Sequence, residues 1–160
     1  MAAFQIATWY DTWNQTGLDN LVNGIVPLNL AGRYNLAFFS LVAQSSGGYA
    51  PGGAGQFASQ VQAQILKQAP TAVVYIGLGS TGIAAAVADN TANNNRSTAN
   101  IVAWLKANGY SGISIDAEEY AVMQVVPDFV TQLGPSFQAA GLGIAISVPW
   151  PGGGPTNLYG

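Results

Sequence analysis

The chain has 160 residues, 7% of them charged, and a formal net charge of −3 at pH 7. It contains no His and no Cys, which excludes Ser-His and Cys-His nucleophile pairs, thiolate redox chemistry and nearly every zinc or haem site. The four basic residues are scattered singly, so the sequence carries no electrostatic footprint for nucleic acid or acidic membranes. We therefore expect no cofactor, no metal site and no nucleic-acid partner.

The size predicts a single domain over residues 1–160, with a Gly/Pro-rich tail at 151–160. No apolar run reaches the roughly 18 residues of a membrane span, and no membrane partner is expected. No signal peptide is visible, which leaves open a cytoplasmic protein or a mature form with an initiating Met. A surface so poor in charge suits self-association, carbohydrate contact or an extracellular location. The alternative is that it only reflects the amino-acid composition of the lineage and has no functional meaning. We expect an extracellular protein.

Segments with strand character alternate with segments of helical periodicity. The five predicted strands are 4–9, 34–42, 72–76, 111–116 and 142–148. Four helices are predicted. The first begins at Thr16 and ends near Pro27, and the second lies around 57–65 and ends before Pro70. The third is capped by Ser97 and ends at Gly109, and the fourth has Pro127 in its first turn. Residues 45–55 indicate a loop, and a polar stretch containing 93–95 precedes Ser97.

This alternation predicts right-handed crossovers and a parallel sheet, either as a barrel or as an open sheet. In both architectures the functional residues gather at the carboxyl ends of the strands. In this chain those ends are 9–13, 39–40, 77–79, 116–118 and 149–150. Aromatic residues, glycines and carboxylates therefore converge on one rim, which is typical of a sugar-binding cleft.

Three of the seven acidic residues, Asp116, Glu118 and Glu119, follow the fourth predicted strand within four positions. Because side chains alternate along a strand, Asp116 and Glu118 share one face and lie about 7 Å apart along it. Like charges resist joint ionisation, so this clustering indicates a chemical site. The alternative is that these carboxylates cap a helix and interact with its dipole. Glu119 points to the other face and is expected in the first turn of the next helix.

Residues 111–118 read S-G-I-S-I-D-A-E. This segment resembles the D-G-x-D-x-D-x-E signature of family 18 glycoside hydrolases, the chitinases and their relatives. The Gly, the last Asp and the Glu match, whereas both earlier Asp positions are Ser in this chain. Residues 34–40, 73–79 and 144–149 resemble the second, third and fifth strands of that family in order. The resemblance implies an α/β fold of the parallel (β/α) barrel type, present in part as about five βα units of a TIM barrel.

The resemblance also implies a substrate-assisted, retaining hydrolysis of β-1,4-linked N-acetylglucosamine (GlcNAc) glycans. In this mechanism the substrate's acetamido oxygen attacks the anomeric carbon. Glu118 would be the general acid and later the base, and Asp116 would hold the acetamido group and stabilise the developing positive charge. Ser114 stands where the family has an Asp, which weakens the hydrogen-bond relay to Asp116. The residues expected to contact substrate are Tyr10, Trp13, Phe39, Gly77, Ser114 and Trp150.

Three hypotheses remain open from the sequence. The chain is a chitinase-like hydrolase, an inactive relative that keeps a sugar-binding cleft, or a structural protein that assembles through its sheet edges. The first and fifth predicted strands would be unpaired edges with apolar residues, which invites pairing with another chain. These edge residues are Phe4, Ile6, Ile144 and Ile146. We expect a homo-oligomer or, alternatively, the remainder of a longer barrel on these edges.

Overall fold

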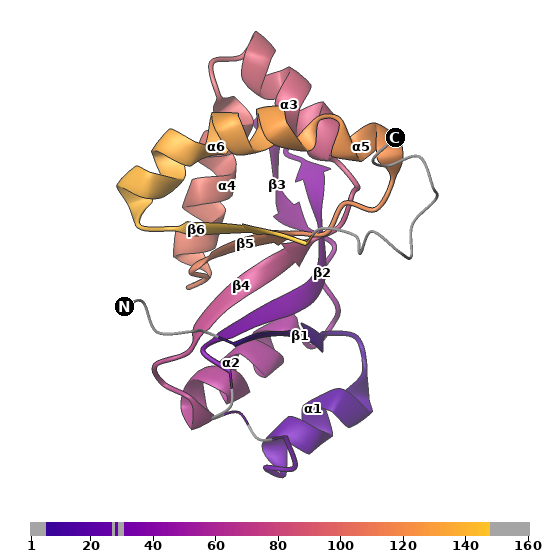
Figure 1. The fold of residues 1–160 in the computed structure, drawn as a ribbon, viewed down its shortest axis with the longest axis vertical. Coiled ribbons are helices and arrows are strands. Elements are labelled where there is room, and N and C mark those ends of the chain that lie inside the picture. The colour runs from indigo at the N-terminus through magenta and orange to yellow at the C-terminus, as the bar shows by residue number, and fades with distance from the viewer. Residues whose placement is uncertain (1–5, 27, 29–30, 148–160) are drawn as a thin grey trace.

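The computed structural model describes residues 6–26, 28 and 31–147. Five parallel strands lie side by side in their order along the chain (Figure 1). They are β1 (Ala7–Asp11), β2 (Arg33–Ala43), β4 (Val73–Leu78), β5 (Gly112–Ile115) and β6 (Gly143–Ile146). The predicted α/β class and the sequential strand order of a partial barrel are confirmed. Phe4, Trp150 and the predicted tail at 151–160 lie outside the described residues.

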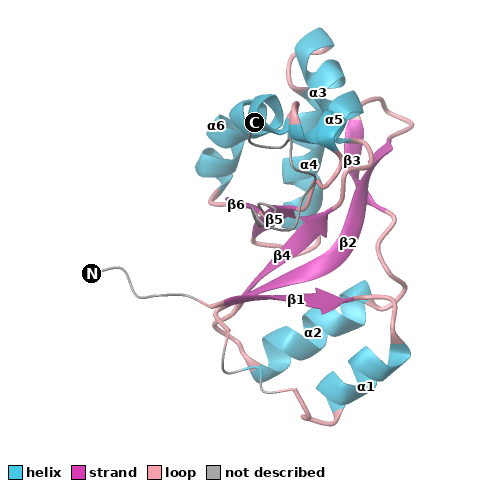
Figure 2. Ribbon diagram, turned by 45° about the vertical axis from the view of Figure 1, so that its right-hand side comes forward, coloured by secondary structure: helices cyan, strands magenta, loops and turns pink. Residues whose placement is uncertain are grey.

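Helices cover one face of this curved sheet in two groups (Figure 2). The first group packs beside β1 and β2 and consists of α1 (Gln15–Val22) and α2 (Ala58–Gln68). The second group comprises α3 (Ile83–Ala92), α4 (Arg96–Ala107) and α6 (Val126–Ala140), with the single-turn α5 (Tyr120–Met123) before α6. None of the described helices is long and apolar enough to cross a membrane.

The strand sequences explain why the helices cover only one face. Alternate residues of β2, β4 and β5 are buried aliphatic or aromatic side chains that pack against the helices, among them Leu36, Ile76 and Ile113. Removing this apolar area from water drives the packing, at about 25 cal/mol per Å². The intervening residues face the inner side of the curve, where the Arg33 guanidinium lies 5.2 Å from the centre of the Tyr75 ring.

The structure contains two elements that the sequence analysis did not predict. Residues 45–55, expected as a loop, contain β3 (Tyr49–Gly52), which pairs antiparallel with the end of β2. Residues 83–92, for which no element was predicted, form α3, whose buried Ile83 and Ala86 are three residues apart, as on one helix face. Small Ala side chains make that apolar face inconspicuous in the sequence.

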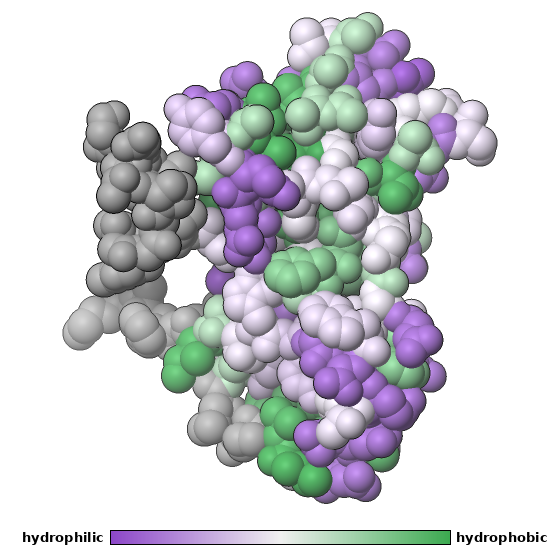
Figure 3. Space-filling model, turned by 90° about the vertical axis from the view of Figure 1, so that its right-hand side faces the viewer, coloured by the Kyte–Doolittle hydropathy of each residue, from purple (hydrophilic) through white to green (hydrophobic). Residues whose placement is uncertain are grey.

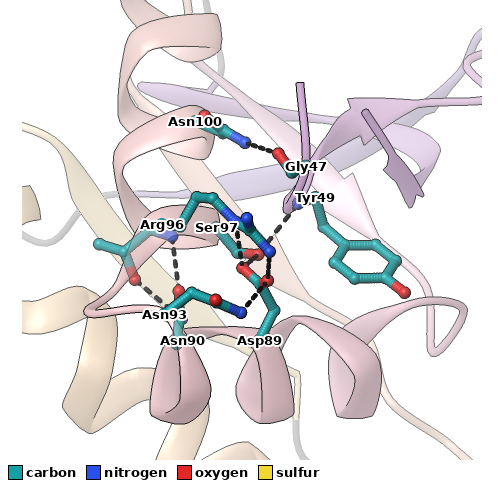
Figure 4. Close-up of polar contacts among 9 residues, drawn as sticks. Gly47, Tyr49, Asp89, Asn90, Asn93, Arg96, Ser97 and Asn100 are labelled. Carbon is teal, nitrogen blue, oxygen red and sulfur yellow. Dashed lines mark hydrogen bonds and ion pairs between the residues drawn. The ribbon is translucent and has the colours of Figure 1, made fainter. Parts of the chain in front are cut away.

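The partly buried carboxylate of Asp89 links the antiparallel β2–β3 pair to the second helix group (Figure 4). Asp89 accepts hydrogen bonds from Asn93, Ser97 and Arg96, and it forms an ion pair with Arg96. The Ser97 hydroxyl in turn accepts a hydrogen bond of 2.9 Å from the Tyr49 backbone N–H. Ser97 therefore lies inside α4, and the α4 N-cap is Asn95 rather than the predicted Ser97. We call Asp89, Asn93, Arg96 and Ser97 the Asp89 cluster.

Candidate functional site

An open pocket of about 210 Å³ lies at the carboxyl ends of β4 and β5, beside the middle of β2 where its pairing with β4 ends. Its lining residues are Phe38, Gly79, Ser80, Asp116, Glu118 and Glu119. The segments that follow parallel strands meet at one edge of the sheet, which explains why residues distant in sequence share this pocket. Figure 3 views the molecule from the side toward which β1 and β4 run, and residues of intermediate hydropathy cover its centre.

Two carboxylates of the predicted site, Asp116 and Glu118, line this pocket together. The backbone N–H of Asp116 donates a 2.8 Å hydrogen bond to the Leu78 carbonyl, which fixes the chain as it leaves β5 beside β4. Partial burial raises the pKa of the Asp116 carboxyl, and the negative charge of Glu118 raises it further. The pocket therefore disfavours two simultaneous negative charges.

The alternative capping role finds no support in the hydrogen bonds of the described residues. The N-cap of α5 is Glu119, and it makes no side-chain capping hydrogen bond. Within ranges 6–26, 28 and 31–147, neither Asp116 nor Glu118 takes part in a side-chain hydrogen bond. Glu119, which was expected to point away, also lines the pocket, because β5 ends at Ile115 and strand alternation no longer applies beyond it.

Phe38, which lines the pocket with the carboxylates, belongs to a group of three exposed aromatic side chains. The ring of Phe38 lies 5.6 Å from that of Trp9 and 6.3 Å from that of Trp13, and it stacks on Trp13 with an interplanar angle of 14°. These side chains are 42%, 37% and 54% exposed, respectively. We call Trp9, Trp13 and Phe38 the aromatic face. Flat aromatic surfaces beside carboxylates suit a ligand that has both apolar ring faces and polar groups.

Gly77 lies against the indole ring of Trp9 and does not line the pocket. A Cβ atom at Gly77 would lie 2.3 Å from Cζ3 of Trp9, so only glycine leaves room for the indole. Ser114 is 2% exposed and is paired with Gly77 in the β4–β5 register. The predicted substrate contacts of Gly77 and Ser114 are therefore corrected to supporting positions on the inner face of the sheet.

The predicted substrate contacts of Phe39 and Tyr10 are wrong. Phe39 is 2% exposed, and its ring packs edge-on against Trp104 and Tyr110 at 5.8 Å from each. Tyr10 faces the helices, and its hydroxyl donates a hydrogen bond to the Gly17 carbonyl. The predicted Trp13 belongs to the aromatic face, whereas the predicted Trp150 lies outside the described residues.

Phe38 and Trp9 were not among the predicted substrate contacts. The β2–β4 pairing shifts register between Leu36 and Phe39, which turns Phe38 toward the pocket and Phe39 toward the helices. Because the β2 sequence is a continuous apolar run, no sequence feature marks the position of this register shift. Trp9 was detectable, since side-chain alternation along β1 places it opposite to Tyr10. Within the described part of the chain, no group of three or more His, Cys, Asp or Glu is arranged to hold a metal ion.

Comparisons with known proteins identify the fold. No family model and no curated protein matches the chain. Among solved structures, the chain is similar to the family 18 chitinase ChiB of Flavobacterium johnsoniae, with a TM-score of 0.64 and 18% identity over 89% of this chain and 45% of that one. It is also similar to human YKL-39, described as a pseudo-chitinase with retained chitooligosaccharide binding, with a TM-score of 0.63 and 14% identity over 91% and 44%.

A third similar structure is the chitinase domain of the spore coat protein CotE from Clostridium difficile. Its TM-score is 0.63, with 16% identity over 90% of this chain and 41% of that one. The chain thus spans less than half the length of these structures. The chain has the fold of the corresponding part of the family 18 chitinases and chitinase-like proteins.

Proposed function

We propose that this chain belongs to a chitinase-like glycoside hydrolase that acts on β-1,4-linked GlcNAc glycans. The observation that carries the proposal is the presence of Asp116 and Glu118 in one open pocket beside the exposed aromatic face. Sugar rings have apolar faces that pack on aromatic side chains, and their polar edges reach neighbouring carboxylates. The fold shared with the chitinases supports the same assignment.

In the proposed reaction the substrate's acetamido oxygen attacks the anomeric carbon, and Glu118 donates a proton to the leaving oxygen. Glu118, now a carboxylate, then removes a proton from the water that opens the intermediate. Asp116 holds the acetamido group and stabilises the positive charge that develops on it. Burial and the neighbouring charge of Glu118 raise the pKa of Asp116, so the two carboxyl groups interact within one pocket.

A second candidate function is binding of GlcNAc oligomers without cleavage. Two observations favour it: Glu118 is exposed, and Ser114 occupies a position at which the chitinase signature has an Asp. A general acid works best when burial or a neighbour raises its pKa toward neutrality. YKL-39 illustrates that the shared fold also occurs in a pseudo-chitinase that retains chitooligosaccharide binding.

Incubation with tetra-N-acetylchitotetraose, followed by mass spectrometry of the products and calorimetry of binding, tests both candidates. Release of shorter GlcNAc oligomers supports the hydrolase. Saturable binding without products supports the binding protein and contradicts the hydrolase. Absence of both products and binding at millimolar oligomer contradicts both functions.

We further propose that copies of the chain associate through the edges of the sheet. The outer strands are β1 and β6, and Ile6 and Ile146 at these edges are exposed. Unpaired strand edges with apolar side chains invite pairing, and a charge of −3 provides little repulsion. Sedimentation velocity over micromolar concentrations should show a dimer or larger species, and a monomer throughout would contradict this.

An extracellular location also remains a proposal, which fractionation of the source cells would test.

A further inference from the structure

A buried hydroxyl connects the loop that carries Trp13 to the part of β2 that carries Phe38. Thr12 is 0% exposed, although it is polar and lies outside any helix or strand. Its Oγ1 donates a 2.8 Å hydrogen bond to the Ala37 carbonyl and accepts one of 3.1 Å from the Gly55 N–H. Its own carbonyl accepts a 2.9 Å hydrogen bond from the Phe57 N–H. Thr12 therefore joins the end of β1 to β2 and to the segment before α2.

The position of Thr12 relates it directly to the aromatic face. Thr12 precedes Trp13, and Ala37, whose carbonyl it binds, precedes Phe38. The two rings that stack at 14° are thus each one residue from the two ends of a single buried hydrogen bond. Gly55 confirms how tightly this point is packed, since a Cβ there would lie 2.3 Å from the Thr12 hydroxyl and carbonyl.

We infer that Thr12 is a positioning residue whose hydroxyl holds Trp13 and Phe38 in the stacked arrangement that binds a sugar ring. Thr12 touches no ligand in this proposal and acts only through its two neighbours. The inference rests on the proposed function for its ligand, a GlcNAc oligomer. Its geometric part, the control of the aromatic face by the Thr12 hydroxyl, is independent of that ligand.

The matched variants are Thr12→Val, which keeps the shape and removes the hydroxyl, and Thr12→Ser, which keeps the hydroxyl. Thr98→Val is the control, because Thr98 is also buried and its hydroxyl accepts a 2.9 Å hydrogen bond from Asn90, distant from the aromatic face. Labelling with 5-fluorotryptophan gives the tryptophans separate ¹⁹F resonances. Trp104, packed against Tyr110, provides an internal reference.

We expect Thr12→Val to shift the Trp9 and Trp13 resonances and to weaken binding of tetra-N-acetylchitotetraose about 10-fold, equivalent to about 1.4 kcal/mol. Thr12→Ser should restore both, and Thr98→Val should change neither while lowering thermal stability. If Thr12→Val does not fold, Gly55→Ala, which displaces Thr12 sterically, should produce the same resonance shifts.

Wild-type-like resonances and affinity in Thr12→Val, or equal changes in Thr98→Val, would overturn the inference. A wild type that binds no GlcNAc oligomer would contradict the proposed function instead. In that case the ¹⁹F resonances alone would still decide whether Thr12 holds the aromatic face.

Discussion

The surroundings of Asp89 and those of the Asp116–Glu118 pair are built in opposite ways. Asp89 is surrounded by donors, with Arg96, Ser97 and Asn93 all directed at its oxygens. Asp116 and Glu118 line one open pocket and have no side-chain donor among the described residues. The chain has few charges, and it places one carboxylate where the fold satisfies it and two where a ligand can reach them.

The pKa shifts follow this difference in surroundings. Hydrogen bonds from Arg96 and Ser97 lower the pKa of the Asp89 carboxyl to about 2, whereas burial and the charge of Glu118 raise that of Asp116. A lowered pKa means that ionised Asp89 stabilises the folded state. A raised pKa means that ionised Asp116 destabilises it. The comparison indicates a structural role for Asp89 and a ligand-directed role for Asp116, as is common where a functional site costs stability.

The largest expected effect is on catalysis. Replacing Glu118 with Gln removes the acidic proton, so hydrolysis of chitotetraose should fall about 10³-fold while the unfolding midpoint stays nearly unchanged. Glu119→Gln is the matched control, since it makes the same charge change in the same pocket, and its activity should remain within about 10-fold of the wild type. Equal losses in the two variants, or a parallel loss of stability in Glu118→Gln, would contradict the assignment of Glu118.

Phe38 and Phe39 are adjacent on β2, and substituting each one separately tests which of the two is a core residue and which is directed at a ligand. Phe39→Ala opens a cavity beside Trp104 and Tyr110 and should lower the free energy of unfolding by about 3–5 kcal/mol. Phe38→Ala alters an exposed ring and should cost less than about 1 kcal/mol. Urea denaturation of both variants measures the difference. Similar losses would show that Phe38 is a core residue and would remove it from the proposed site.

A smaller effect is expected on ligand affinity. Trp13→Ala removes the outer ring of the aromatic face and should weaken chitotetraose binding about 10-fold, or about 1.4 kcal/mol. The control is Leu66→Ala, which changes an exposed apolar residue of α2 away from the pocket. Calorimetry compares the two dissociation constants. If Leu66→Ala weakens binding as much as Trp13→Ala does, the aromatic face is not the sugar-binding surface.

The smallest effect concerns the dependence of stability on pH. The stabilisation from Asp89 is complete above its ordinary pKa of 3.8 and is lost as the pH falls through about 2. Thermal melts of Asp89→Asn should therefore show a lower midpoint than the wild type at pH 5, and this difference should shrink toward pH 2.

Asp116→Asn is the comparison of opposite sign. The raised pKa of Asp116 gives stability that is present below the ordinary pKa of 3.8 and is lost as the pH rises through the folded-state value. This variant should match or slightly exceed the wild-type midpoint at pH 7. A lower midpoint there would assign Asp116 a structural role like that of Asp89.

The sequence predicted the order of the five parallel strands because their apolar runs and the glycines and prolines between them are local signals. It also placed Asp116 and Glu118 together, since both follow one strand. It could not predict that Phe38 rather than Phe39 lines the pocket, because that choice depends on a register shift between β2 and β4. The α3 helix was missed because its buried face, formed by Ile83, Ala86 and Asn90, contains only one large apolar side chain.

The central claim is that the carboxylate pocket and the aromatic face form one GlcNAc-binding surface. Titration of tetra-N-acetylchitotetraose into ¹⁵N-labelled Glu118→Gln protein, followed by amide chemical shifts, tests it most directly because no cleavage interferes. The account predicts saturable shifts at Gly79, Ser80 and Asp116, together with shifts of the Trp9 and Trp13 indole N–H signals. Shifts confined to α1 and α2, or none at millimolar oligomer, would contradict it.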